Sequence, residues 1–187
     1  MPTITYLVGP PAVGKHTIGS ELADLTGAAL IDNHLVNDPI FRAYGADGRT
    51  PLPDWVWELV ERVREATMTA VTDARPEVSH IFTNYLSSEP EDEQFVQMLR
   101  DTAAGRGAQF VPVWLTCPED ELVRRVALPG RAERHKLRDA DALRTILRTQ
   151  GVLPAPPDAL VLDTSAIPSP EAAQRIVDHT HAALSMD

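Results

Sequence analysis

The chain has 187 residues, of which 43% are hydrophobic and 24% are charged, and this is the composition of an ordinary globular domain with room for a core. The formal net charge of −10 argues against a general nucleic-acid binder, because phosphate contacts need clustered lysine and arginine. The single cysteine, Cys117, excludes an internal disulfide framework and fits a reducing cytoplasm. No apolar stretch approaches the roughly 20 residues of a membrane span, and the first residues have the pattern of a strand rather than a signal peptide. We therefore expect one cytoplasmic, non-membrane domain over residues 1–187.

The first predicted strand leads into a glycine-rich turn. Residues Ile4–Val8 are apolar and partly β-branched, as in a buried strand, and apolar residues then recur at helical spacing over Ile18–Leu25. Residues 9–15 read Gly-Pro-Pro-Ala-Val-Gly-Lys, which matches the G-x-x-x-x-G-K pattern of a phosphate-binding loop. Such a turn points several backbone N–H groups into one concavity, and Lys15 can neutralise the outer phosphates. A phosphate site is the leading hypothesis, and the alternative is a chance Gly-Lys turn before an ordinary helix.

The residues after this lysine bear on metal binding. The serine or threonine whose hydroxyl usually binds Mg²⁺ is replaced by His16, and Thr17 follows. This pattern keeps Thr17 as a candidate metal contact and leaves direct coordination of Mg²⁺ open. The residues expected to contact a nucleotide are Gly9, Pro11, Ala12, Val13, Gly14, Lys15, His16 and Thr17.

Three polar residues follow the second predicted strand. Asp32, Asn33 and His34 come directly after Ala28–Ile31, at the carboxyl edge where open parallel sheets bind ligands. Asp32 is the first candidate for a general base or for orienting Mg²⁺ through water, and His34 is the second candidate base. The alternative is an Asp32 that only caps a helix over Leu35–Tyr44, beside a solvent-exposed histidine.

A long helix and a third strand come next. Asp54 is predicted as the N-cap of a helix that ends near residue 74. Trp55 and Trp57, at its start, are predicted to pack in the core, and partial cover of an acceptor pocket is the alternative.

The end of the third strand, Ser79–Asn84, lacks an acid. Many P-loop NTPases carry an Asp or Glu for Mg²⁺ where this chain has Thr83 and Asn84. This difference disfavours a motor-type or switch-type ATPase and favours a small-molecule kinase. Asn84 and Tyr85 are candidate acceptor contacts, with packing as an equal alternative.

Positive charge gathers in one segment late in the chain. Residues 124–148 hold eight basic and three acidic residues, whereas the rest holds nine basic and 24 acidic ones. A solvated helix face is the alternative interpretation. Because phosphoryl transfer needs cations and the exclusion of water, we interpret residues 127–139 as a mobile lid over a triphosphate, hinged at Pro129-Gly130.

The remaining elements complete an alternating pattern. Capping boxes predict helix starts at Ser88 with Glu91 and at Thr116 with Glu119; Asp139 is predicted to cap a further helix, and a last helix runs from Pro170 to Leu184. The predicted strands are Ile4–Val8, Ala28–Ile31, Ser79–Asn84, Phe110–Leu115 and Leu160–Leu162. Strands and helices that alternate in this way are typical of an α/β fold with a parallel sheet and right-handed crossovers.

A family resemblance extends over nearly the whole chain. The motif of residues 9–17, the turn of residues 32–34, and the segment of residues 125–137 resemble an AAA-type group of P-loop small-molecule kinases, related to nucleoside-monophosphate and shikimate kinases. The resemblance implies a three-layer fold with strand order 2-3-1-4-5, a substrate-binding helical insert over about residues 33–75, and a lid over about residues 127–139. By the same resemblance Lys15 binds phosphate, Gly14 and Thr17 contact it, and Arg125 and Arg131 serve as nucleotide or lid arginines. A shikimate kinase would show two aspartates after strand two, where this chain has Asp32 and His34.

These observations predict an ATP-dependent kinase. It would use ATP and Mg²⁺ to phosphorylate a small-molecule acceptor and would act as a monomer or homodimer, with Lys15, Asp32, His34, Arg125 and Arg131 as its catalytic residues. Two alternatives remain open: an ATP-binding regulator without transfer activity, and a nucleic-acid end kinase, which the acidic surface makes the least favoured. The sequence does not name the acceptor or the choice between ATP and GTP.

Overall fold

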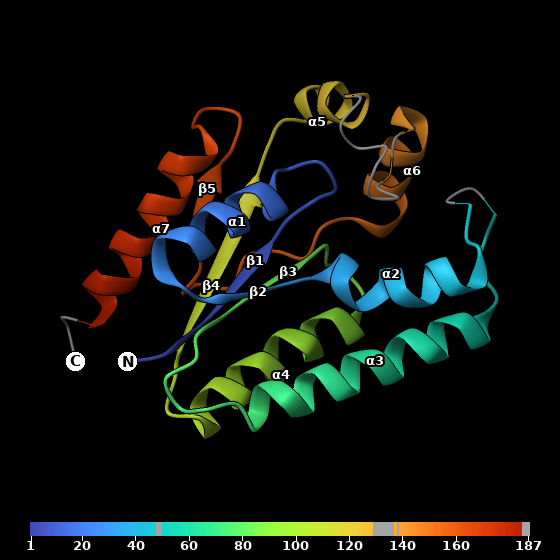
Figure 1. The fold of residues 1–187 in the computed structure, drawn as a ribbon. Coiled ribbons are helices and arrows are strands. Elements are labelled where there is room, and N and C mark those ends of the chain that lie inside the picture. The colour runs from blue at the N-terminus through green and yellow to red at the C-terminus, as the bar shows by residue number, and fades with distance from the viewer. Residues whose placement is uncertain (48–49, 129–136, 138, 185–187) are drawn as a thin grey trace.

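Five parallel strands form one sheet at the centre of the computed structural model (Figure 1), which describes residues 1–47, 50–128, 137 and 139–184. The strands are β1 (Thr3–Val8), β2 (Ala29–Asp32), β3 (His80–Asn84), β4 (Gln109–Thr116) and β5 (Leu160–Asp163). The helices are α1 (Lys15–Thr26), α2 (Asn33–Tyr44), α3 (Asp54–Thr72), α4 (Pro90–Gly105), α5 (Glu119–Val126), α6 (Ala140–Gln150) and α7 (Ser169–Leu184). Within the described ranges no helix has both the length and the apolar character needed to cross a bilayer.

The strand order is β2-β3-β1-β4-β5, as predicted. In the parallel register of the three central strands, Val8 lies opposite Asn84 on one side and Trp114 on the other. Strands β1 and β3 therefore end together, β2 ends one pair earlier, and the loops that follow these three strands emerge at one edge of the sheet. This edge is where ligands bind in open parallel sheets.

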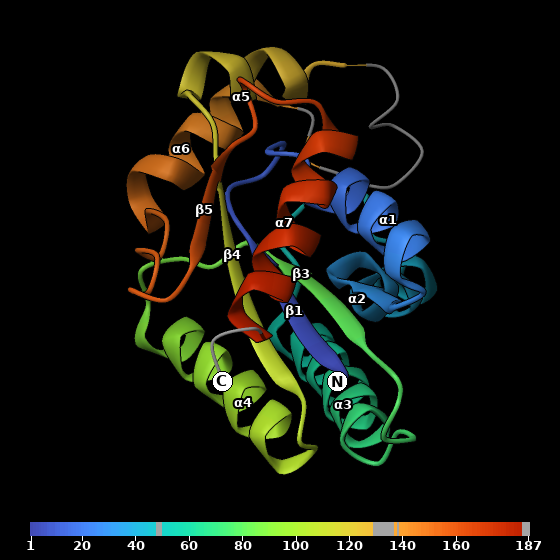
Figure 2. The ribbon, with the colours of Figure 1, turned by 90° about the vertical axis from the view of Figure 1, so that its left-hand side faces the viewer.

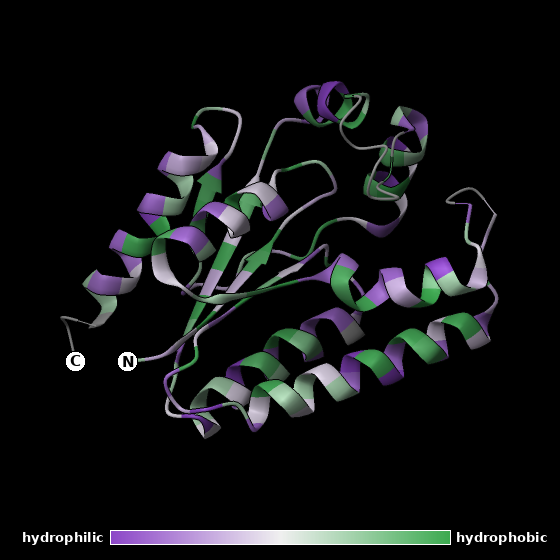
Figure 3. Cartoon of the chain, in the orientation of Figure 1, coloured by the Kyte–Doolittle hydropathy of each residue, from purple (hydrophilic) through white to green (hydrophobic). Residues whose placement is uncertain are grey.

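Helices cover both faces of the sheet (Figure 2). Leu7 of β1 packs in one core cluster with side chains of α1 and α7, and its neighbours Tyr6 and Val8 pack in a second cluster with side chains of α3 and α4. Successive strand residues point to opposite faces, and both faces are buried. This is why the strands are almost continuously apolar, whereas the helices carry hydrophobic and hydrophilic stripes (Figure 3).

Two segments extend beyond the sheet. Helices α2 and α3 pack on each other. They follow β2 and precede β3 in the sequence, where the helical insert is predicted. Helices α5 and α6 flank the predicted lid. Most of that segment, with Arg131 and the Pro129-Gly130 hinge, lies outside the described residues, and so the lid stays a prediction.

Three predicted helix starts are wrong. Helix α3 has Pro53 as its N-cap, so Asp54 is its first helical residue. Helices α4 and α5 begin after Glu89 and Pro118, and neither N-cap residue makes a side-chain hydrogen bond. Pro90 is the first helical residue of α4, a position that suits proline because its φ angle is already helical and its missing N–H needs no partner there. The predicted cap at Asp139 is confirmed, since its carboxylate accepts hydrogen bonds from two backbone N–H groups of α6.

The two tryptophans of α3 do not lie in the core. Trp55 is 53% exposed and Trp57 is 48% exposed. Each packs edge to face on an aromatic residue of α2, Trp55 on Tyr44 and Trp57 on Phe41. The core prediction is wrong because the first turns of α3 extend past the sheet, where these two side chains pack on α2 instead.

Candidate functional site

The phosphate-binding loop, residues 9–15, joins the end of β1 to the start of α1. Gly14 has a φ of +108° and Ala12 a φ of +70°, a left-handed conformation that costs an alanine about 1–2 kcal/mol. The Val13 N–H donates to the Pro10 carbonyl oxygen, and the Val13 carbonyl oxygen accepts a hydrogen bond from the Thr164 hydroxyl at 2.8 Å. Contacts on both sides of the turn thus hold a strained backbone, a feature that clusters at ligand-binding sites.

Lys15 bends back over this loop. Its Nζ donates hydrogen bonds to the carbonyl oxygens of Gly9 at 2.6 Å and Pro10 at 2.9 Å. The ammonium group therefore lies above the turn, where the amides of the loop and the N-terminus of α1 favour an anion.

Gly9 has no space for a side chain. A Cβ atom there would lie 2.5 Å from the Leu115 carbonyl oxygen of β4 and 3.1 Å from Cγ1 of Val13. We expect Gly9→Ala to lower the free energy of unfolding by about 1–3 kcal/mol, because the clash is with strand backbone that cannot move aside. Gly105→Ala is the matched control, since a Cβ there meets nothing within 4 Å. Denaturant unfolding of both variants checks this, and an equal stability for the two would contradict it.

Asp32 links several elements at the edge of the sheet through hydrogen bonds. Its side chain is almost fully buried, yet it accepts hydrogen bonds from His16 Nδ1 at 3.0 Å, the His34 backbone N–H at 2.9 Å and the Thr83 hydroxyl at 3.1 Å. The bond from His34 makes Asp32 the N-cap of α2. Asp32 thus joins β2, β3 and the first residues of α1 in one hydrogen-bonded group.

These bonds keep Asp32 ionised. Burial by itself would raise the pKa of Asp32, but the hydrogen bonds from His16 and His34 and the nearby imidazoles hold that pKa well below its usual range. An ionised carboxylate can only accept hydrogen bonds, so Nδ1 of His16 is the donor. Asp32 is consequently a poor proton acceptor and a strong anchor for the His16 ring.

His34 lies one residue further on, in the first turn of α2. Its Nδ1 is 3.2 Å from the Asp38 carboxylate, and the other oxygen of that carboxylate is 3.7 Å from the Arg42 guanidinium. His34 is a half-buried side chain, and the charges of Asp38 and Arg42 balance each other beside it. The structure therefore places the His34 side chain in a polar row on α2 with Asp38 and Arg42, while the His34 backbone N–H belongs to the Asp32 group.

Arg125 connects the phosphate-binding loop to the end of β5. Its guanidinium donates to the Val13 carbonyl oxygen at 3.4 Å and to the hydroxyl and carbonyl oxygens of Thr164 at 3.1 and 2.8 Å. Glu121, one turn earlier on α5, also accepts from it at 2.7 Å. In this structure Arg125 supports the loop from beneath. Thr164 was not predicted from the sequence. Its place directly after the last strand is the signal that could have identified it.

One cavity of about 750 Å³, hereafter the main cavity, brings these groups together. The sequence-predicted residues that line it come from the phosphate-binding loop, the start of α1, the segments that follow β2 and β3, and α5. They are Pro11, Ala12, Val13, Gly14, Lys15, His16, Thr17, Asp32, Asn33, His34, Thr83, Tyr85 and Arg125. Leu137 of the predicted lid segment also lines it, and residues that the sequence did not single out complete its wall, among them Ile146, Thr164 and Ile167. Asn84 does not line it, although it was predicted beside Tyr85.

Solved structures match the chain, whereas no protein-family model and no curated protein sequence matches it. A gluconokinase from Sinorhizobium meliloti 1021 is 19% identical, with a TM-score of 0.61 over 97% of this chain and 93% of that chain. An APS kinase from Mycobacterium tuberculosis in complex with AMPPNP and APS is 18% identical, with a TM-score of 0.54 over 96% and 98%. A shikimate kinase from Acinetobacter baumannii in complex with shikimate is 21% identical, with a TM-score of 0.52 over 98% and 94%. The chain has the fold of these kinases. The predicted three-layer P-loop kinase fold is thus confirmed.

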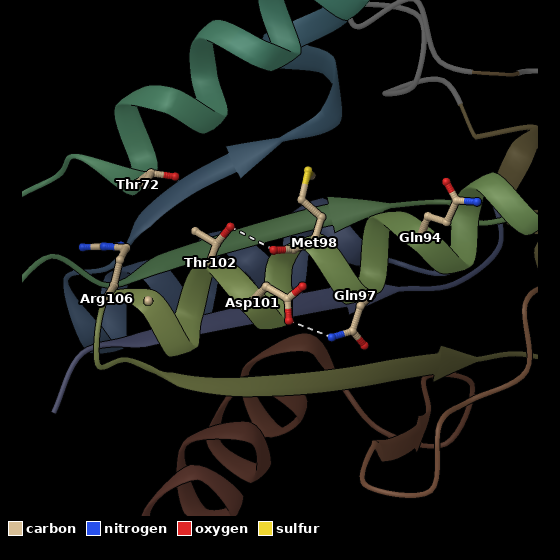
Figure 4. Close-up of a pocket in the computed structure, with 8 residues that line it drawn as sticks. Thr72, Gln94, Gln97, Met98, Asp101, Thr102 and Arg106 are labelled. Carbon is tan, nitrogen blue, oxygen red and sulfur yellow. Dashed lines mark hydrogen bonds between the residues drawn. The ribbon is translucent and has the colours of Figure 1, made fainter.

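The main cavity lies at the carboxyl edge of the sheet, where open parallel sheets bind ligands. A second hollow lies elsewhere. The second, of about 570 Å³, lies between α3 and α4 (Figure 4). Gln97 donates to Asp101 and Thr102 donates to the Met98 carbonyl oxygen, so these polar groups bond along α4 itself. This hollow extends to Thr72 and Arg106 at the ends of their helices, just before β3 and β4 begin. It therefore lies at the amino edge of the sheet, opposite the phosphate-binding loop.

The side chains of the main cavity fit a magnesium ion held chiefly by a nucleotide. Within the described ranges no three His, Cys, Asp or Glu residues group as metal ligands. Mg²⁺ usually keeps several waters and binds through phosphates with one or two carboxylates. Asp32 is one ionised carboxylate beside the loop, whereas the exposed Thr17 lines the cavity from α1.

Proposed function

We propose that the protein transfers the γ-phosphoryl group of ATP to a hydroxyl or phosphate of a small-molecule acceptor. The observation that carries this proposal is the main cavity, where the phosphate-binding loop with Lys15 and the ionised Asp32 face one space. The fold shared with gluconokinase, shikimate kinase and APS kinase supports it, as does the AMPPNP bound to the last of these.

Lys15 and the loop would carry most of the catalysis. The loop amides and the N-terminus of α1 bind phosphate, and the Lys15 ammonium leaves the carbonyl oxygens of Gly9 and Pro10 to neutralise the transferring group. Mg²⁺, when bound with the nucleotide, supplies further neutralisation of the phosphates. The predicted role of Arg131 as a lid cation stays part of the proposal, and Arg125 would act by holding Val13 in place.

Asp32 and His34 would act on the acceptor side. With three hydrogen bonds on its carboxylate, Asp32 suits the orientation of His16 and of metal-bound water better than it suits proton removal. His34 is then the side chain we assign to take the acceptor proton. In the transfer to a hydroxyl, the acceptor oxygen bonds to the γ-phosphorus, the bond from that phosphorus to the bridging oxygen breaks, ADP leaves, and the hydroxyl proton passes to His34.

The test is the transfer of labelled γ-phosphate from ATP–Mg²⁺ to nucleosides, nucleotides, gluconate, shikimate and APS. We expect a labelled product that depends on Lys15, and the labelled compound names the acceptor class. ATP binding through Lys15 with no labelled product from a broad panel would contradict transfer and favour the ATP-binding regulator. Label on oligonucleotide ends would instead favour the nucleic-acid end kinase, whose binding should weaken steeply with salt.

A further inference from the structure

A further pocket, distinct from the hollow between α3 and α4, adjoins the main cavity at the outer end of the helical insert. It has a volume of about 270 Å³ and is hereafter the apolar pocket. Five of its seven lining residues are apolar, and the two polar ones are Arg42 and Thr50. The apolar residues are Phe41, Ala46, Pro51, Leu52 and Trp57. A concave, mainly apolar site with a few polar groups is the usual form of a small-molecule pocket.

Trp57 connects the two spaces. Its side chain lines both the main cavity and the apolar pocket. The Phe41 ring lies 5.3 Å away at 85°, which holds the indole in an edge-to-face pair. With 48% of Trp57 exposed, part of the indole is accessible to a ligand at the boundary between the apolar pocket and the main cavity.

A row of polar side chains on α2 also runs from one space to the other. His34 lines the main cavity, Arg42 lines the apolar pocket, and both contact the carboxylate of Asp38 between them. Their spacing of four residues puts all three on one face of the helix. Among the described residues that line the apolar pocket, Arg42 is the one with a charged side chain, and Asp38 compensates its charge.

We propose that the acceptor is an amphipathic alcohol, with its hydroxyl in the main cavity near His34 and an aromatic or branched aliphatic group on Trp57 in the apolar pocket. This assignment rests on the proposed function and deepens it, because it names the substrate class. Compact, wholly polar acceptors such as gluconate would leave the apolar pocket empty. They would be poorer substrates than alcohols that carry an aryl group.

Two variants of α3 isolate the role of the apolar pocket. Trp57→Ala removes the shared wall, and Trp55→Ala is the matched control. Trp55 has similar exposure and a similar edge-to-face pair with Tyr44 at 5.5 Å, but it is not among the residues that line either space. Both side chains are half exposed, and so both variants should fold.

The first measurement is the binding of 4-nitrobenzyl alcohol, followed by ligand-observed NMR. We expect binding to wild type, to Trp55→Ala and to Lys15→Ala, and binding weaker by about tenfold or more to Trp57→Ala, since an apolar group in a pocket is worth roughly this factor. Equal binding to Trp57→Ala and wild type, or no binding to wild type, would overturn the proposal.

The second measurement compares kcat/KM for matched acceptors, such as adenosine with N6-benzyladenosine and methyl glucoside with benzyl glucoside. We expect a preference for the benzyl member of an accepted pair that falls to near one in Trp57→Ala and persists in Trp55→Ala. Equal use of both members by wild type would overturn the acceptor class while leaving the kinase intact. Probe binding that depends on Trp57, without any Lys15-dependent transfer, would instead overturn the proposed function and with it the assignment of the ligand as an acceptor.

Discussion

Lys15→Ala should lower the rate of phosphoryl transfer from ATP by about 10³-fold or more, because a positioned cation stabilises the charge of the transition state in a site that excludes water. The folded state should lose little. The Lys15 ammonium donates hydrogen bonds to two loop carbonyl oxygens, and a typical bond of this kind contributes about 0.5–1.5 kcal/mol. Steady-state transfer to the best acceptor measures the rate, and denaturant unfolding measures the stability. Calorimetry measures ATP binding by the same variant.

The matched control for this variant is Arg175→Ala. Arg175 is an exposed cation on α7 whose guanidinium pairs with Glu171 at 2.6 Å, and exposed pairs of this kind contribute about 0–1 kcal/mol. It should leave both transfer and ATP binding unchanged. Transfer that survives in Lys15→Ala at wild-type rate would contradict the assignment of residues 9–15 as the catalytic phosphate site.

Asp32→Asn should impair both stability and transfer. The substitution keeps the shape and one acceptor oxygen for the helix cap, but it turns an amide N–H group toward donors that Asp32 now accepts from, His16 Nδ1 and the Thr83 hydroxyl. We expect the free energy of unfolding to fall by about 1–3 kcal/mol, because buried donors lose their partners. Transfer should fall by about 10²-fold, since the His16 ring and the metal-bound water lose their anchor.

The stability effect of Asp32 should depend on pH. Its pKa in the folded state lies below its usual value, which is about 3.9 in an unfolded chain. The ionised carboxylate therefore contributes its full stabilisation above about pH 4, and this contribution is lost as pH falls toward the folded-state pKa. The difference in unfolding free energy between wild type and Asp32→Asn should shrink from pH 5 to pH 2, and a difference that stays constant would contradict this account.

Asp139→Asn is the control for this variant. Asp139 also caps a helix through two backbone N–H groups, but it is exposed and does not line the main cavity. Asparagine caps helices as well as aspartate, so stability should change by less than about 0.5 kcal/mol. Equal losses for the two variants would mean that Asp32 acts only as a helix cap.

Much of the fold could be predicted because its signals are local. An apolar run such as Ile4–Val8 can be buried on both faces only inside a covered sheet, and the glycine pattern of residues 9–15 specifies a turn that few other residues permit. Helix starts were less predictable. Ser88 and Thr116 each fit a capping box, yet the chain turns into α4 and α5 at prolines two residues later.

The sequence predicted at which edge of the sheet the candidate site lies, but it did not predict the hydrogen bonds within the site. That the loops after β1, β2 and β3 meet follows from parallel strands in register. Asp32 caps α2 and also accepts a hydrogen bond from His16, which lies 16 positions earlier in the sequence. This pairing depends on how α1 packs against β2 and β3. The same holds for Arg125 and Thr164, which meet beneath the loop from elements 39 residues apart.

The alternating α/β architecture, the phosphate-binding loop and the polar residues at the strand ends could be predicted from the sequence, because each rests on residue patterns within short segments of the chain. The tertiary structure sets which polar groups pair, because a hydrogen bond needs two atoms within about 3 Å and sequence spacing does not set that distance across elements. It also decided that Trp57 lies half exposed between two cavities rather than in the core, because the burial of a side chain depends on which elements pack beside it.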